Sequence, residues 1–127
     1  MVTKIWVVLA ALSLVLSAAN SSSLEKYPVA HFLNRIDNET VSIDCSEGGS
    51  TKLEPVQKFS FEAKDKDNDD AYICYCEYGE RPYSLEVKGY QQARDKGYDI
   101  YWMFVRLGIA ASYDNKYYTL VERWKSD

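Results

Sequence analysis

Apolar and polar side chains alternate with a period of two along most of the chain after residue 27, which is the pattern of β-strands. The strongest run is Ala71–Tyr78, eight residues rich in aromatic and sulfur side chains, bounded by two aspartates and a glycine. We predict that this run is the central strand of the fold. Successive side chains of a strand point to opposite faces, so one face carries Tyr72, Cys74, Cys76 and Tyr78, and the other carries Ile73 and Tyr75.

Six further runs show strand character. They are Tyr27–Ile36, Thr40–Cys45, Gln57–Ala63, Pro82–Tyr90, Asp99–Leu107 and Tyr117–Trp124. The turn residues 37–39 predict that the first two of these runs form a hairpin. Residues 46–55 contain two adjacent glycines and read as a loop, residues 64–70 as a charged turn, and residues 91–97 as a polar connection with one helical turn.

Short strands at regular spacing, without a long helical period, predict an all-β fold. We expect an antiparallel β-sandwich of seven or eight strands, and an eight-stranded barrel is the alternative architecture.

The first 19 residues have the features of a signal peptide. Lys4 precedes an apolar run over residues 5–16, and small residues follow at 17–19. The run is shorter than the roughly 20 residues that span a bilayer. We therefore predict a cleaved signal peptide at 1–19, a disordered leader at 20–26 and one domain at 27–127, in a secreted, extracellular protein that does not insert into the membrane.

The charge balance limits the classes of partner. The chain has 15 lysines and arginines against 19 acidic residues, for a formal net charge of −4. No basic cluster is present that would release counterions from phosphates, so we expect no binding of nucleic acid. Eleven tyrosines suit both sheets and interaction surfaces.

The sequence gives little support for catalysis. Its one histidine, His31, lies inside a predicted strand, and no nucleophile motif accompanies it. The run Asp65, Asp67 and Asp69 has the spacing of the first calcium ligands in an EF-hand loop, but the required turn glycine and final glutamate are missing. We therefore predict a protein that is not an enzyme and that holds no metal or cofactor.

Secretion favours glycosylation and disulfide formation. The sequon at Asn38 lies in a predicted turn, so Asn38 is the expected glycosylation site. Of the three cysteines, Cys45 ends one strand, and Cys74 and Cys76 share a face of another. By strand geometry alone, either Cys74 or Cys76 can pair with Cys45.

These residues together resemble the plant self-incompatibility protein family, the S-protein homologues. The matching motifs are a strand ending in cysteine (41–45), a Phe-x-Phe strand (58–61), an aromatic-x-Cys-aromatic strand (72–75), a Trp followed by Gly-Ile (102–109) and a closing Trp124. The family's second pair of cysteines is absent, and Cys76 stands where the family has an aromatic residue.

The resemblance implies a secreted β-sandwich with a Cys45–Cys74 disulfide, and it leaves Cys76 as a buried free thiol. It also implies a signalling ligand that is recognised by a cell-surface receptor protein, and we expect it to be a monomer. A secreted carbohydrate-binding protein or small hydrolase is the alternative. Polar loops carry recognition on rigid sandwiches, so the residues expected to contact a partner are Lys64, Asp65, Lys66, Asp67, Asn68, Asp69, Asp70, Glu80, Arg81, Arg94, Asp95 and Lys96.

Overall fold

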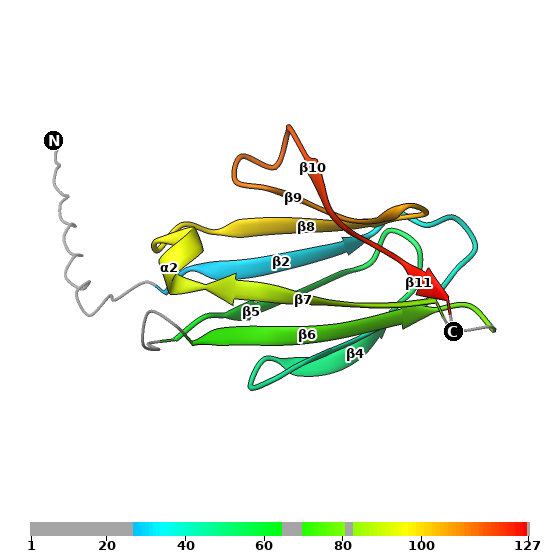
Figure 1. Cartoon of the computed structure of the whole chain (residues 1–127), viewed down its shortest axis with the longest axis horizontal. Helices are drawn as coiled ribbons and strands as arrows, with labels where there is room; N and C mark the ends of the chain where they lie inside the picture. Colours follow the sequence, from blue (N-terminus) through cyan, green and yellow to red (C-terminus); the bar gives the residue numbers. More distant parts are fainter. Residues whose placement is uncertain (1–26, 65–69, 81–82, 127) are drawn as a thin grey trace, which may run out of the picture.

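Figure 1 shows a computed structural model of the chain, which describes residues 27–64, 70–80 and 83–126. Its strands form two five-stranded sheets, so the fold is the predicted all-β sandwich and not a closed barrel. The predicted signal peptide and leader lie outside the described residues.

One sheet, here called the β2 sheet, has the strand order β10-β9-β8-β2-β5. β2 lies between β5 and β8, antiparallel to the first and parallel to the second, and the remaining neighbours are antiparallel. The strands are β2 Val29–Asn34, β5 Lys58–Glu62, β8 Ile100–Val105, β9 Gly108–Ser112 and β10 Thr119–Arg123.

The other sheet, the β6 sheet, has the order β11-β7-β6-β3-β4 with all neighbours antiparallel. The predicted central strand is confirmed, because β6 occupies the middle of this sheet. A four-residue helix, α2 Gln92–Asp95, joins β7 to β8. The strands are β3 Val41–Cys45, β4 Gly49–Leu53, β6 Ala71–Tyr78, β7 Tyr83–Gln91 and β11 Lys125–Ser126.

The predicted hairpin between the first two strands is wrong. β2 and β3 belong to different sheets, and both edges of β2 are occupied by β5 and β8. The turn at residues 37–38 does form, but it carries the chain from one layer to the other. Asn34 makes this possible, because its side-chain oxygen accepts a hydrogen bond from the backbone N–H of Ile36 just beyond the ladder.

The segment that reads as a loop at 46–55 contains a strand. β4 pairs with β3 along its whole length, from Gly49 opposite Cys45 to Leu53 opposite Val41. β4 is an edge strand, and of its residues only Leu53 is fully buried. An edge strand with one exposed face needs few apolar residues, so its sequence lacks the usual alternation.

Aromatic rings fill the space between the sheets. Phe32 is fully buried at the centre, and its ring centroid lies 6.1–6.2 Å from those of Phe59, Phe61, Trp102 and Phe104. The inward face of β8 is buried, and its outward residues Tyr101, Met103 and Val105 are half-buried.

The disulfide joins Cys45 to Cys74, in agreement with the family resemblance. The sheet register accounts for the choice, because Cys74 lies directly opposite Cys45 on the neighbouring strand, whereas Cys76 lies opposite Ile43. The bridge closes a separation of 29 residues, which in the chain-entropy account stabilises the fold by about 3–4 kcal/mol.

Cys76 is a buried free thiol. Burial raises its pKa to about 12, so the reactive thiolate form is scarce at neutral pH. Nearby, Gly89 is the extra residue of a bulge in β7, where a Cβ atom would lie 2.7 Å from the sulfur of Cys74. The disulfide therefore requires glycine at this position.

Candidate recognition surface

Polar segments from distant parts of the sequence meet at the α2 end of the sandwich (Figure 1). Lys64, Asp70 and Gln92 line one hollow there. The predicted contact residue Glu80 is exposed at the opposite end, in the turn between β6 and β7. The expected contact residues Asp65, Lys66, Asp67, Asn68, Asp69 and Arg81 lie outside the described residues.

The prediction that Asp95 is a surface contact residue is wrong, because its side chain is only 1% exposed. Its carboxylate accepts hydrogen bonds from the backbone N–H of Gln91 at 2.9 Å, from Arg94 Nε and Nη2 at 2.6 Å each, and from the hydroxyl of Tyr113 at 2.5 Å. A buried carboxylate is tolerated because these donors replace water. Asp95 therefore lies beneath the surface and fixes the positions of Arg94 and Tyr113.

Arg94 connects this carboxylate to the core. Its guanidinium lies 5.5 Å from the ring centre of the buried Trp102, at a cation–π distance. Burial acts to lower the pKa of Arg94, but the hydrogen bonds and charge of Asp95 outweigh it, so the pKa lies above its ordinary value. The Arg94 guanidinium therefore stays protonated beside the carboxylate.

The segment after α2 is fixed by its backbone. Lys96 adopts the left-handed conformation with φ 53°, and Gly97 follows with φ 86°. The N–H of Gly97 donates to the Tyr90 hydroxyl at 2.9 Å, and that hydroxyl donates to Gln92 at 3.0 Å. This turn brings Tyr98 to the surface, where it is 69% exposed.

A second turn, at residues 113–117, completes the surface. The Asp114 carboxylate accepts hydrogen bonds from the hydroxyl of Ser112 at 2.7 Å and from the backbone N–H groups of Lys116 and Tyr117 at 2.8 and 3.0 Å. These hydrogen bonds lower the pKa of Asp114 to about 2. The turn exposes Tyr113 by 52% and Tyr117 by 83%.

We call this region the tyrosine surface. Arg94, Lys96, Tyr98 and Tyr113 line an open hollow of about 480 Å³ between its two segments, and the name also covers Tyr117, which is exposed in the turn that follows Tyr113. Arg94 and Lys96 are among the contact residues expected from the sequence, whereas Tyr98, Tyr113 and Tyr117 are not. The signal for Tyr113 and Tyr117 was available, since two tyrosines lie beside the turn-forming Asp114-Asn115 pair.

His31 has a carboxylate partner that the sequence spacing does not reveal. Its Nε2 lies 3.2 Å from Oδ2 of Asp99, 68 residues away, and its ring stacks on Tyr101 with centroids 4.4 Å apart. Among the described residues, the hollow that His31 and Tyr101 line is about 100 Å³, compared with roughly 300–1,000 Å³ for most small-molecule sites.

Asn38 lies in the turn before β3 and is exposed, with φ 62°. An exposed turn is a suitable place for a glycan, and glycosylation of Asn38 stays a prediction. Among the residues that the structure describes, no group of three or more His, Cys, Asp or Glu side chains is arranged to hold a metal ion. In the same part of the chain, no helix has the length and apolar character needed to cross a bilayer.

Comparisons with protein-family models, curated proteins and solved structures found no match to this chain. The resemblance to the S-protein homologues therefore rests on the sequence motifs described above.

Proposed function

We propose that this protein is a small, secreted, non-enzymatic signalling ligand of the self-incompatibility type, and that a cell-surface receptor protein recognises its tyrosine surface. The observation that carries the proposal is the buried Asp95, which bonds to Arg94 on one segment and to Tyr113 on another, 18 residues away. One carboxylate thus fixes two surface segments relative to each other.

The composition of the tyrosine surface supports protein recognition. Tyrosine and arginine are enriched among the residues that dominate the energetics of protein interfaces. Tyrosine also has few rotatable bonds, so it adds contact area at low entropic cost. Because Asp95 holds the two segments in place before binding, less conformational freedom is lost when a partner docks.

Two observations support secretion. The N-terminal residues have the signal-peptide pattern, and the fold contains a disulfide, which persists in oxidising compartments.

A binding assay on intact cells of the source tissue tests the proposal. Labelled mature protein is expected to bind saturably, and brief proteolysis of the cell surface is expected to abolish binding. The double variant Tyr98→Ala/Tyr117→Ala is expected to bind at least about tenfold more weakly, since tyrosine is enriched among the interface residues whose truncation costs about 2 kcal/mol or more.

Tyr83→Ala is the matched control, because Tyr83 is an exposed tyrosine on β7 away from the tyrosine surface. It is expected to bind like the wild type. The proposal is wrong if the double variant binds with unchanged affinity, or if binding survives proteolysis of the surface proteins.

A further inference from the structure

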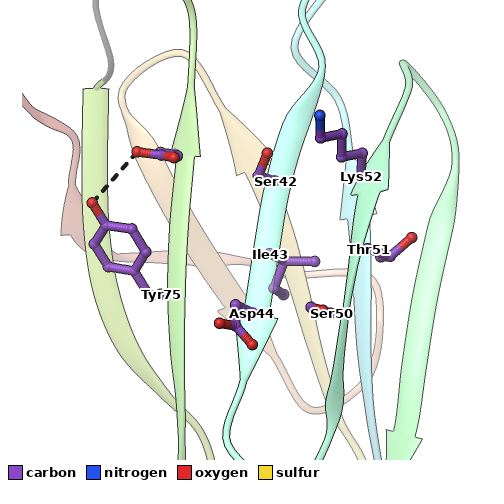
Figure 2. A pocket seen from close by; sticks show the side chains of 8 residues that line it. Ser42, Ile43, Asp44, Ser50, Thr51, Lys52 and Tyr75 are labelled. Carbon is purple, nitrogen blue, oxygen red and sulfur yellow. Dashed lines mark hydrogen bonds between the residues drawn. The ribbon is translucent and has the colours of Figure 1, made fainter.

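The outward face of the β6 sheet carries a second open hollow, of about 400 Å³, away from the tyrosine surface (Figure 2). β3, β4 and β6 contribute its walls. The lining residues that matter for its chemistry are Ser42, Asp44, Ser50, Lys52, Tyr75 and Glu77.

Tyr75 is the one aromatic side chain among the residues that line this hollow, and it is 48% exposed in the middle of the sheet. Its neighbours along β6, Cys74 and Cys76, point into the core, so the ring faces solvent. The Tyr75 hydroxyl donates to Glu77 over 3.5 Å, the contact drawn in Figure 2. So long a contact is weak, and a ligand hydroxyl can replace it.

Carboxylates flank Tyr75 on both sides. The register places Asp44 of β3 and Glu86 of β7 directly across from it. Neighbouring strands lie about 4.8 Å apart, so a ligand ring lying on Tyr75 has an acceptor at each edge. Two residues farther along β3 and β6, about 6.8 Å away, Ser42 and Glu77 lie opposite each other on the same outward face.

The charges of this face restrict the ligand. Around Tyr75 the outward face carries Asp44, Glu77 and Glu86 against two lysines, Lys52 in the hollow and Lys88 opposite Ile73 on β7, and this acidic excess disfavours phosphate, sulfate and uronic acid groups. What fits is a neutral molecule with one apolar face for the ring and hydroxyl donors around its edge for the carboxylates.

We infer that this face binds a neutral oligosaccharide, with one sugar ring stacked on Tyr75 and its hydroxyls donating to Asp44 and Glu86. A pyranose ring with equatorial hydroxyls has both required features, a flat C–H face and donors at its rim. The hollow is open along the sheet, so it accepts an internal segment of a chain as well as an end. This binding site is separate from the tyrosine surface and adds to the proposed function.

Titration of the mature protein with cellohexaose, followed by amide chemical shifts, tests the inference. We expect binding at about millimolar Kd, as suits a shallow open site, with shift changes confined to β3, β4, β6 and β7. Tyr75→Ala is expected to weaken binding about tenfold, and Glu86→Gln to weaken it severalfold without changing the shape of the face. Tyr83→Ala, on the same sheet but outside the hollow, is the matched control and is expected to bind with wild-type affinity.

Tri-galacturonic acid and a chitosan hexamer serve as anionic and cationic probes. Neither is expected to bind more tightly than cellohexaose, and preferential binding of either one contradicts the assignment of a neutral ligand. The inference is also overturned if cellohexaose causes no shift changes, or if Tyr75→Ala binds like the wild type. Tyr75→Ala is expected to keep full binding to cells, so failure here is distinguishable from failure of the receptor proposal.

Discussion

Asn34 and Asp95 are buried polar side chains at opposite ends of the sandwich, and they differ in what they bond. At the end where β2 finishes, Asn34 is fully buried, and its amide donates to the carbonyls of Glu39 and Leu53 at 2.8 and 2.9 Å. At the α2 end, Asp95 accepts hydrogen bonds from Arg94 and Tyr113, which reach the surface.

The Asn34 end therefore serves the stability of the fold, whereas the Asp95 end also positions side chains on the surface. The neutral amide of Asn34 bonds only to backbone groups, so it holds its loops together without positioning any exposed side chain. A carboxylate bonded to long side chains fixes the direction of groups that a partner can touch. Burial of a polar residue thus supports recognition when its partners are themselves exposed side chains, and the following predictions test that distinction.

The largest effect is expected for Asn34→Ala. The change leaves two carbonyls and the N–H of Ile36 without partners in the interior, at about 1–3 kcal/mol each, so we expect a loss of about 4 kcal/mol in the free energy of unfolding. Chemical denaturation measures it. Asn34→Asp keeps the size but directs a carboxylate at two carbonyls, and it is expected to be at least as destabilising. A loss below about 1 kcal/mol for Asn34→Ala would contradict the structural role.

Asp95→Ala is expected to cost about 3 kcal/mol, because Arg94 and Tyr113 lose a shared buried acceptor. The cost is smaller than for Asn34 because the Arg94 side chain is one-third exposed and water can replace part of the interaction. The same denaturation experiment applies. In addition, Asp95→Ala is expected to weaken cell binding, whereas Asn34→Asp at a temperature where it remains folded is not. Equal effects of both variants on binding would remove the distinction between the two ends.

The α2 end is expected to be sensitive to alkaline pH, whereas Asn34 does not titrate. Burial, together with the hydrogen bond and charge of Asp95, raises the pKa of Tyr113 from 10.0 to about 12. The folded state therefore holds this proton more tightly than the unfolded state, so the contribution is complete below pH 10 and is lost as pH rises toward 12. Denaturation at pH 9 and pH 11.5 should show a smaller decrease for Tyr113→Phe than for the wild type. An equal decrease would show that Tyr113 does not carry this effect.

The smallest effect concerns the turn that exposes Tyr117. Hydrogen bonds lower the pKa of Asp114 from 3.8 to about 2, so the turn is stabilised above pH 3.8 and loses this stabilisation as pH falls through about 2. The amide proton shifts of Lys116 and Tyr117 should titrate together with a midpoint near pH 2. In Asp114→Asn that titration should disappear; its persistence would mean that another group is responsible.

The sequence determined the local features of this protein, because alternation and turn chemistry depend on neighbouring residues. The run Ala71–Tyr78 is β6 with the predicted faces, and the polar connection after β7 contains the single turn α2. Residues 108–126 were less well predicted, and three strands that were not expected, β4, β9 and β11, raise the described total from seven to ten.

Only the tertiary structure decided which strands pair and which polar residues are buried. Alternation states which face of a strand is buried but does not state which strand lies beside it, and so β2 pairs with β8, some 70 residues later, instead of with β3. Asp95 reads as a surface residue in a run of polar residues, because nothing local shows that Arg94 and Tyr113 will surround it. Asp99 likewise meets His31 only through the β2–β8 pairing. Contacts between residues far apart in the chain arise from strand pairing and from packing the two sheets, and one such contact, between Asp95 and Tyr113, joins the two segments of the tyrosine surface.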